Sequence, residues 1–371
     1  VGRRPGLLGT LHYEIGERRI PAARTTPEAP DLQAMLYQMV RAGCDSAVME
    51  VSSHGLAQDR VTGTDFDVGI FTNLSVDHLD YHHTLDEYFE TKSLLFREST
   101  GLAGAHTAMV LNVDDSWGRK LALRAGRRER VMTYGLSPEA EVRALDERVH
   151  AGGIEFDLLS PWGCAPVRLG LLGRFNIENA LAAIASAGML GLPLEPVVQH
   201  LASAQPVPGR LEVVPTDLHF QVYVDYAHTE DALANVLRTL REICDGRLIV
   251  VFGCGGDRDR SKRSRMGAAA ARWASQVYLT SDNPRTEDPE RILDEIEEGC
   301  DGADSVVRIV DRREAIAAAL AFADAGDIVL VAGKGHETVQ EIGHTVVPFD
   351  DRQAVEDRSW SFLICEGYDA G

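Results

Sequence analysis

Apolar and amphipathic stretches alternate along most of the chain, and this alternation predicts strands followed by helices. Residues 31–43, DLQAMLYQMVRAG, carry apolar side chains three and four positions apart, which predicts a helix with Asp31 as its N-cap and Gly43 at its end. The apolar runs at 46–51 and 66–72 predict buried strands. The first part of the chain therefore follows the pattern of β-α-β units.

The alternation continues after a less regular middle part. Residues 84–98 begin with a capping box of Thr84 and Glu87 and predict a second helix. A β-rich stretch covers about 130–172, and a helix is predicted near 177–190. Further strands are predicted near 221–225, 247–252, 276–280, 305–310 and 327–332. This order of elements is typical of an α/β protein with parallel sheets.

The chain is long enough for two domains, because its 371 residues can bury two sizeable cores. Residues 205–214, QPVPGRLEVV, contain two prolines and a glycine and predict an interdomain linker. We therefore expect one domain at 1–207 and a second at 208–371.

Nearly all the unusual polar residues of the second half lie in loops that follow predicted strands. These loops are DYAHT at 225–229, GCGGDRDRSKR at 253–263, SDNPRTED at 281–288 and AGKGHE at 332–337. Open parallel sheets bind their ligands at the carboxyl ends of the strands. We therefore expect these loops to face one crevice and to form a binding site.

One of these loops contains an arginine that turn formation does not require. The residues at 282–284 have ordinary turn chemistry, whereas Arg285 adds a planar fork that suits a carboxylate. Arg258 can approach the same crevice, and Glu337 can meet an ammonium group. Together they suit a zwitterionic amino acid. A structural salt-bridge network would use the same residue types and stays open as an alternative.

The composition narrows the classes of partner. A net charge of -20 disfavours nucleic acid and membrane surfaces, which are polyanionic, although a well-solvated acidic surface also explains it. No apolar run approaches the ~20 residues of a membrane span, and VGRRPGLLGT lacks the apolar core of a signal peptide. The six cysteines include no C-x-x-C pair, which suits a reducing compartment. We expect a cytoplasmic monomer with small-molecule partners, no nucleic acid and no membrane.

Two loops of the first half carry candidate metal ligands. MEVSSHGLAQDR at 49–60 places Glu50 at the end of a predicted buried strand, where an unpaired carboxylate is costly. FTNLSVDHLDYHHT at 71–84 adds His78. Mg²⁺ takes one or two carboxylates together with phosphate oxygens, so Glu50 is a candidate ligand. A helix-capping cluster around Glu50 and a structural role for His78 are the alternatives.

Lys92 is chemically unusual because the chain has only four lysines and this one falls on the apolar stripe of its predicted helix. A desolvated lysine has a lowered pKa, and its neutral amine can react. The alternative is a lysine whose stem packs while its ammonium reaches water.

Nucleotide-binding motifs are incomplete. GCGGDRD follows an apolar strand but does not match G-x-G-x-x-G. Asp282 stands near the position where a dinucleotide-binding domain has an acidic residue. A dehydrogenase is therefore a distant alternative. The sequence contains no G-x-x-x-x-G-K-[ST], since AGKGHE is shorter and lacks the final hydroxyl residue.

In their order and spacing, these motifs resemble the Mur ligases of peptidoglycan synthesis. The resemblance begins near Leu8 and runs to the C-terminus; it is carried by TT (25–26), MEVSSHGLAQDR, FTNLSVDHLDYH, YFETKSLLF, GRFNIENALAA, VPGRLEVV, VDYAHT, VFGCGGDRDRSKR, DNPRTEDP and VAGKGHE. The word DNPR resembles that of diaminopimelate-adding members. A lysine-adding ligase and a folylpolyglutamate-synthase-like enzyme stay open. The resemblance implies a central parallel-sheet domain and a C-terminal Rossmann-like α/β domain.

The resemblance also implies a role for each matching residue. A UDP-muramoyl-dipeptide would contact Thr25, Thr26, Ser52, Gln58 and Arg60. ATP would contact Asn176, Asn179, Arg210, Asp225 and His228. The amino acid meso-diaminopimelate would contact Arg258, Asp282, Asn283, Pro284, Arg285, Gly333 and Glu337. Two Mg²⁺ ions are expected, with Glu50 and His78 as ligands and with Lys92 as a carbamate that supports the metal.

The implied reaction is phosphorylation of the D-glutamate γ-carboxylate by ATP, followed by attack of the diaminopimelate amine on the acyl phosphate. Two departures from the family pattern qualify this expectation. The family's P-loop would stand a few dozen residues before Thr25, and neither it nor the uridine-binding N-terminal domain is found in this sequence; Glu230 also replaces a proline. We therefore expect a truncated central domain with little or no activity, and a non-catalytic binding remnant is the alternative from another class.

Overall fold

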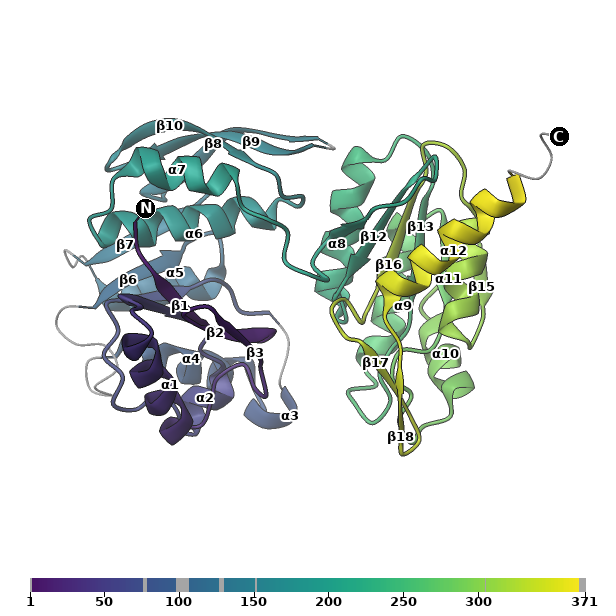
Figure 1. The fold of residues 1–371 in the computed structure, drawn as a ribbon, viewed down its shortest axis with the longest axis horizontal. Helices are drawn as coiled ribbons and strands as arrows, with labels where there is room; N and C mark the ends of the chain where they lie inside the picture. Colours follow the sequence, from purple (N-terminus) through teal and green to yellow (C-terminus); the bar gives the residue numbers. More distant parts are fainter. Residues whose placement is uncertain are drawn as a thin grey trace. The chain divides into compact units, whose positions relative to one another are not determined.

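The computed structural model describes residues 2–75, 79–97, 107–126, 130–150, 152–303 and 305–366. The chain divides into two compact units (Figure 1). The first consists of Val1–Arg148, Glu155–Leu169 and Phe175–Ser203, and the second of Val149–Ile154, Gly170–Arg174 and Ala204–Gly371. Both units combine sheets with helices, so the predicted α/β class is confirmed.

The first unit contains a small mixed sheet with the strand order β3-β2-β1-β4. Its strands are β1 (Pro5–Leu8), β2 (His12–Ile15), β3 (Arg18–Pro21) and β4 (Ser46–Met49). β1 pairs antiparallel with β2 and parallel with β4, where Leu8 lies opposite Met49. This parallel pair brings the loop after β1 and the loop after β4 to the same edge of the sheet.

A larger sheet of the first unit has the order β10-β9-β8-β7-β6-β5. Its strands are β5 (Val68–Phe71), β6 (Ala108–Asn112), β7 (Val131–Gly135), β8 (Val142–His150), β9 (Gly153–Ser160) and β10 (Gly163–Leu169). The helices are α1 (Ala29–Arg41), α2 (Ser53–Ala57), α3 (Leu79–His82), α4 (Leu85–Ser93), the 3-10 helix η1 (Leu94–Phe96), α5 (Ser116–Ala125), α6 (Phe175–Met189) and α7 (Leu194–Ala202). One apolar core joins residues of both sheets, such as Leu8 and Leu111, with α4.

The second unit is built on a sheet with the order β11-β12-β16-β13-β14-β15. Its strands are β11 (Glu212–Val214), β12 (Gln221–Asp225), β13 (Leu248–Phe252), β14 (Gln276–Leu279), β15 (Val306–Arg308) and β16 (Ile328–Ala332). All neighbours pair in parallel except β11 with β12. A hairpin of β17 (Val339–Ile342) and β18 (Thr345–Pro348) follows.

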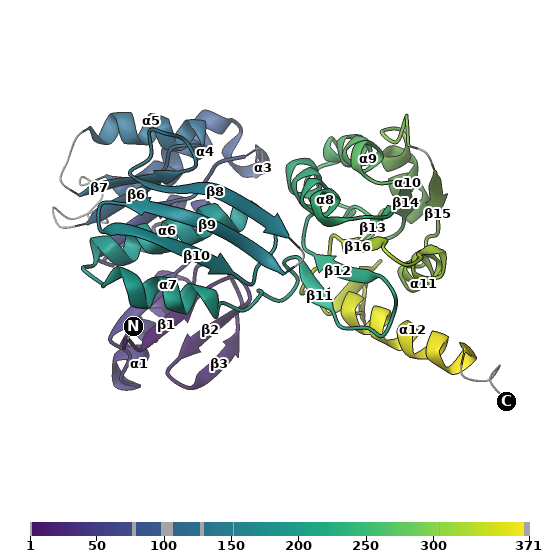
Figure 2. The same cartoon turned by 90° about the horizontal axis from the view of Figure 1, so that it is seen from above.

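Helices cover both faces of this sheet (Figure 2). They are α8 (Glu230–Ile243), α9 (Lys262–Trp273), α10 (Pro289–Glu297), α11 (Arg312–Phe322) and α12 (Asp351–Glu366). Alternate strand residues face opposite sides: Val250 packs toward α8, α9 and α10, whereas Val251 packs toward α11 and α12. This alternation explains why β12, β13 and β16 are apolar almost throughout.

The strand predictions in the second half are confirmed, but two predictions in the first half are wrong in part. The strand at 46–51 exists as β4 and is not buried: Val48 is 59% exposed, because β4 lies at the end of the strand order. The helix predicted from Asp31 begins at Ala29, with Glu28 at its N-cap, because Pro30 fits the first helical turn. Its predicted end is confirmed, since Gly43 follows the C-cap with a φ of 81°.

Other local predictions also agree with the structure. Thr84 caps α4 by accepting a hydrogen bond from the backbone N–H of Glu87. The β-rich stretch contains β7, β8, β9 and β10, and α6 occupies the helical region that follows it. No helix in the described part of the chain is long and apolar enough to cross a membrane.

Candidate active site

A hydroxyl-rich cluster lies at the edge of the small sheet in the first unit. Thr10, in the turn after β1, donates to Glu50 Oε2 at 2.7 Å and lies 3.1 Å from the hydroxyl of Thr25. Thr26 is fully buried and donates to the Glu50 carbonyl at 3.0 Å, and the backbone N–H of Ser52 donates to Thr26 at 2.9 Å. The structure therefore brings together the predicted residues Thr25, Thr26, Glu50 and Ser52.

Arg60 extends this cluster. Arg60 is 8% exposed, and its guanidinium donates to the Thr26 carbonyl at 3.1 Å and to the side-chain oxygen of Gln58. Ser52 itself caps α2 by accepting from the N–H of Gly55 at 3.0 Å. The helix-capping alternative is thus confirmed for Ser52. Glu50, by contrast, is exposed.

Lys92 lies beside an aromatic cluster on α3 and α4. Its ammonium is 5.1 Å from the ring centroid of Tyr88, and that ring stacks on His82 at 4.9 Å. His82 is 1% exposed, and its Nε2 lies 2.8 Å from the hydroxyl of Ser53 at the start of α2. Lys92 is half-buried, and its ammonium contacts the aromatic ring of Tyr88. The sequence singled out Lys92 and missed His82.

The predicted metal ligands are described only in part. His78 lies outside the described residues. Among the described residues, no group of three or more His, Cys, Asp or Glu side chains could hold a metal ion. Glu50 offers an exposed carboxylate, which is the oxygen ligand that Mg²⁺ prefers.

The predicted ATP contacts fall on two separate parts of the chain. Asn176 and Asn179 lie in the first turn of α6 in the first unit, where the Asn179 amide donates to Asn176 Oδ1 at 3.1 Å. Between them, Glu178 accepts from the amide of Asn112 at 2.9 Å, and burial raises the pKa of this carboxyl.

The other three predicted ATP contacts lie together in the second unit. The Arg210 guanidinium is 4.9 Å from the ring centroid of Tyr226, and His228 lies 4.6 Å from the same ring. Asp225 ends β12 and accepts from the N–H groups of Leu211 and Ala227 at 2.7 Å each. Burial raises the pKa of the Asp225 carboxyl, against the lowering effect of these bonds.

His336 joins this aromatic group, although the sequence did not single it out. Its ring centroid lies 5.0 Å from that of Tyr226. Burial and the nearby charge of Arg210 lower the pKa of His336, so the neutral imidazole is favoured. Tyr226 thus packs against two histidines and an arginine. It was not predicted as a site residue from the sequence.

The four polar loops of the second unit leave neighbouring strands at one sheet edge, as predicted. β12, β16, β13 and β14 are adjacent and parallel, so the residues after them share the carboxyl edge. Gly333, which follows β16, has a φ of 113°, and a Cβ at this position would lie 2.7 Å from Asp282 Oδ2 after β14. The two loops therefore approach each other closely only because position 333 is glycine.

A buried polar cluster joins these loops. Asn283 is 5% exposed, and its Nδ2 donates to Glu337 Oε2 at 3.0 Å. The ammonium of Lys334, which is fully buried, donates to Asn283 Oδ1 and to Glu337 Oε2 at 3.0 Å each. The structure brings the predicted residues Asn283 and Glu337 together and adds Lys334, which the sequence marked only as one of four lysines.

Arg285 has an unusual backbone and a partly open guanidinium. Its φ of 50° lies in the left-handed region, which is rare for a residue with a long side chain. Its Nε donates to Glu341 Oε2 at 2.7 Å and its Nη1 to the Gly256 carbonyl at 2.9 Å. Its backbone N–H donates to the Glu341 carbonyl at 3.0 Å, and Ile342 forms a parallel bridge with it. Within the described residues, Nη2 has no hydrogen-bond partner.

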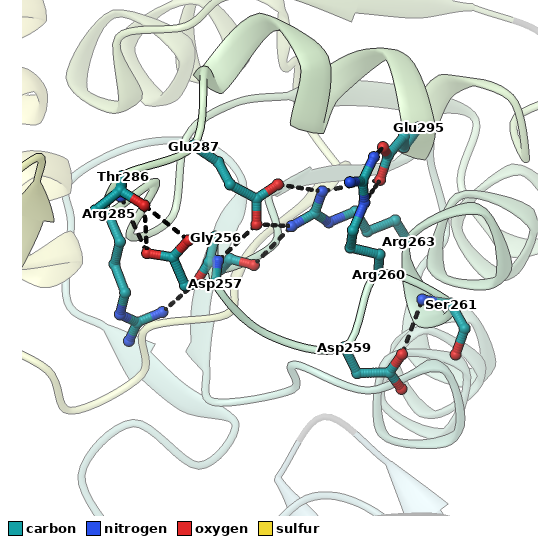
Figure 3. A network of polar contacts seen from close by, with 11 residues as sticks. Gly256, Asp257, Asp259, Arg260, Ser261, Arg263, Arg285, Thr286, Glu287 and Glu295 are labelled. Atoms are coloured by element: carbon teal, nitrogen blue, oxygen red, sulfur yellow. Dashed lines mark hydrogen bonds and ion pairs between the residues drawn. The ribbon is translucent and has the colours of Figure 1, made fainter. Parts of the chain in front are cut away.

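An ion-pair network fixes the loop of Arg285 to the glycine-rich loop after β13 (Figure 3). Arg263 is fully buried and binds both carboxylate oxygens of Glu287, at 2.9 and 2.8 Å. Glu287 accepts from the Asp257 N–H at 2.6 Å, and the Asp257 carboxylate accepts from the hydroxyl and N–H of Thr286. The hydrogen bond from Arg263 is the largest cause that lowers the pKa of Glu287 to about 2.

The remaining predicted residues of this region occupy different environments. Pro284 is buried, and its carbonyl accepts from the N–H of Glu287. Arg258 is exposed, and in the described part of the chain its guanidinium has no hydrogen-bond partner. A salt-bridge network, the alternative left open by the sequence, does exist in these loops, but its centre is Arg263 with Glu287 and Glu295. Arg285 joins it through Gly256 while keeping donors open.

Both units match known families of domains. Residues 3–187 match the Mur ligase middle domain, and residues 209–335 match the Mur ligase, glutamate ligase domain. The chain belongs to the Mur ligase family.

Within this family, the chain is similar to proteins named UDP-N-acetylmuramoyl-L-alanyl-D-glutamate--2,6-diaminopimelate ligase. It is 46% identical over 355 residues to the protein of that name from Geobacillus kaustophilus (strain HTA426), over 95% of this chain and 72% of the relative. It is 48% identical over 355 residues to that of Thermosynechococcus vestitus (strain NIES-2133 / IAM M-273 / BP-1), over 95% of this chain and 70% of the relative. A solved structure of a ligase with the same name covers 97% of this chain and 73% of its own, with 39% identity and a TM-score of 0.69.

Proposed function

We propose that this chain is an ATP-dependent amide ligase that adds meso-diaminopimelate to UDP-N-acetylmuramoyl-L-alanyl-D-glutamate in peptidoglycan precursor synthesis. The single observation that carries the proposal is the set of open polar groups after β14 and β16. Arg285 and Asn283 offer N–H donors there, and Glu337 offers a carboxylate oxygen. The names of the relatives give the same reaction.

The choice of amino acid rests on Arg285. Meso-diaminopimelate carries a carboxylate at its far end, and lysine has none. An arginine whose Nε is already held by Glu341 can offer its Nη2 edge to that carboxylate. With lysine bound, the same edge would lose its water and gain no partner, which is costly. The loop therefore supports selection against lysine.

The nucleotide substrate would bind the cluster of the first unit. The hydroxyls of Thr25 and Ser52, the amide of Gln58 and the guanidinium of Arg60 supply donors for a dipeptide carboxylate and carbonyl groups. Thr26 is fully buried, and its two bonds to the segment after β4 support a role in holding Glu50 and Ser52 in place. Asn176, Asn179, Arg210, Asp225 and His228 are the proposed contacts of ATP.

Mg²⁺ is the proposed metal, and Glu50 fits it as an oxygen ligand; His78 is the second proposed ligand. When bound, the metal neutralises charge that develops on transferred phosphate oxygens. The cluster of the first unit would hold the γ-carboxylate, and the residues after β14 and β16 would hold the diaminopimelate amine. Both substrates and ATP are small metabolites of the cytoplasm, where we place the reaction.

We also propose that Lys92 carries a carbamate that supports the metal. Lys92 is half-buried, and the neutral amine of a lysine is the form that adds to CO₂. The added carboxylate would supply a further oxygen ligand for the metal.

The test is a ligation assay with UDP-N-acetylmuramoyl-L-alanyl-D-glutamate, ATP and Mg²⁺, in which mass spectrometry detects the tripeptide product. Any product that forms should contain meso-diaminopimelate, with a preference over lysine on the order of 10⁴ in kcat/KM. The Arg285→Ala variant should lose most of this preference. An unchanged preference in that variant would contradict the role of Arg285, and lysine used as well as diaminopimelate by the unaltered chain would contradict the proposed function.

A further inference from the structure

Lys334 is a buried cation in the middle of the amino-acid cluster, and the proposed reaction does not use it. Its side chain is fully buried, and its Nζ lies 3.0 Å from Asn283 Oδ1 and 3.0 Å from Glu337 Oε2. An ammonium group in such a place is costly unless it is paired and hydrogen-bonded. Both partners are proposed to touch the amino acid. Lys334 therefore acts on the site through them.

The contacts of Lys334 determine which way the Asn283 amide points. Asn283 Oδ1 accepts from Lys334 and also from the backbone N–H of Glu341 at 3.1 Å. Both of these groups can only donate, so the oxygen of the amide has to lie on this side. The Nδ2 group then lies on the other side, where it donates to Glu337 Oε2 at 3.0 Å.

This orientation leaves a set of groups that complements an amino acid. One N–H of Asn283 and the Nη2 group of Arg285 have no acceptor among the described residues, and Glu337 Oε1 has no donor there. N–H donors suit a carboxylate, and a carboxylate oxygen suits an ammonium. The reversed amide would place its oxygen against the Glu337 carboxylate and would remove a donor from the site.

We propose that Lys334 is a positioning residue of the amino-acid site: its ammonium fixes the orientation of the Asn283 amide and holds the charged Glu337 in place. This inference rests on the proposed function, because it assumes that Asn283 and Glu337 meet the amino acid. Glu341 assists through its backbone N–H, which a change of its side chain does not remove.

The first test needs no ligand. In ¹⁵N spectra of the whole chain, the side-chain amide of Asn283 is assigned by its absence from Asn283→Ser. We expect this signal to move in Lys334→Met, because its oxygen loses a charged donor. The matched control is Lys262→Met, whose Nζ donates to the carbonyl of His228 at 2.8 Å and which should leave the signal unmoved. An unmoved signal in a folded Lys334→Met chain overturns the inference.

The second test is calorimetry with meso-diaminopimelate in the presence of saturating UDP-muramoyl-dipeptide. We expect Kd to rise at least tenfold in Lys334→Met and to change less than twofold in Lys262→Met. Glu337→Gln and the double variant Lys334→Met/Glu337→Gln separate the two effects of Lys334, because the glutamine carries no charge for Lys334 to neutralise. We expect a further rise of at least threefold in the double variant, caused by the Asn283 amide alone.

The outcomes distinguish the inference from the function on which it rests. An equal Kd for Glu337→Gln and the double variant overturns the positioning of Asn283. If Lys334→Met does not fold, this pair decides, since the double variant removes both charges and Glu337→Gln keeps a side-chain oxygen that can accept from the Lys334 ammonium. An unaltered chain that binds no diaminopimelate contradicts the proposed function, and the Asn283 signal then decides whether Lys334 sets the amide orientation.

Discussion

Arg263 and Glu287 form a two-bond ion pair in which the guanidinium has no exposed surface and both carboxylate oxygens are used. Arg263 lies at the start of α9, and Glu287 precedes α10. The pair therefore joins the glycine-rich loop after β13 to the loop that contains Arg285 (Figure 3). Its removal is expected to affect stability and amino-acid selection together.

We predict that Glu287→Gln lowers the free energy of unfolding by about 3 kcal/mol, because it leaves the buried Arg263 short of a counter-charge. Urea unfolding followed by circular dichroism measures this change. Glu298→Gln is the matched control: Glu298 is an exposed residue at the end of α10, and its change should stay within about 0.5 kcal/mol. Equal losses in the two variants would show that the ion pair contributes nothing.

The same pair predicts a dependence of stability on pH. The pKa of Glu287 is lowered from 4.5 to about 2 in the folded chain, so the charged form is favoured by folding. Its contribution is fully present above about pH 4.5 and is lost as the pH falls through 2. The difference in unfolding free energy between the unaltered chain and Glu287→Gln should therefore shrink between these values. Urea midpoints at a series of pH values test this, and a difference that stays constant down to pH 2 contradicts it.

We predict that Gly333→Ala weakens both the fold and the use of diaminopimelate. The substitution forces a φ of 113° on alanine and places its Cβ 2.7 Å from Asp282 Oδ2. Gly302→Ala is the control, since Gly302 has a φ of 93° but nothing within 4 Å of the point that an added Cβ would occupy. Gly302→Ala should lower the free energy of unfolding by about 1 kcal/mol through the backbone alone. Gly333→Ala should lower it by clearly more. Equal costs in thermal unfolding would mean that the contact with Asp282 relaxes freely.

The fully buried pair of Arg312 and Asp351 supports a further prediction. Arg312 binds both oxygens of Asp351 at 2.7 Å. It also donates to the carbonyl of Ser281, which follows β14, and to that of Ala332, which ends β16. Arg312→Met should cost about 3–5 kcal/mol, because a buried aspartate is left unpaired. Arg313→Met, the exposed neighbour that pairs with Asp357, should cost less than about 1 kcal/mol. Chemical unfolding measures both, and a small loss for Arg312→Met would contradict the prediction.

The proposed carbamate of Lys92 has a direct test. Intact mass measured under conditions that retain CO₂ should exceed the sequence mass by one CO₂, and Lys92→Arg should show no such increase. Lys120→Arg is the control, because Lys120 is also half-buried and its ammonium is paired with Asp86 at 2.9 Å. It should keep the added mass. Equal masses for the unaltered chain and Lys92→Arg in bicarbonate, once the Lys-to-Arg difference is subtracted, would contradict the carbamate.

The sequence predicted those features that depend on local pattern and on motif order. The parallel strands of the second unit, the Thr84 cap and the grouping of polar loops at one sheet edge follow from periodicity and from the geometry of parallel sheets. The resemblance of the motifs predicted the family. Asn283 and Glu337 were predicted to meet at one site, and their side chains are hydrogen-bonded.

Other features depend on contacts that local pattern does not contain. The exposure of Val48 follows from the place of β4 in the strand order, which the sequence of β4 does not encode. The roles of Arg263 and Lys334 depend on partners 24 and 51 positions away, at Glu287 and Asn283. The left-handed φ of Arg285 follows from its bridge to the β17 hairpin, whose two short strands gave no clear signal. A single sequence does not show whether an arginine or a lysine is buried.

The position of β16 has a consequence for how the chain matures during translation. β16 lies between β12 and β13, yet more than 70 residues separate it from the end of β13 in the sequence. Until the ribosome has released Ile328–Ala332, β12 and β13 have no strand to join them, and the loops after them cannot be aligned. Domains generally fold as units once their chain has emerged. The amino-acid site is therefore among the last features of the nascent protein to form, and a ribosome that stalls before β16 leaves a half-sheet with two open edges.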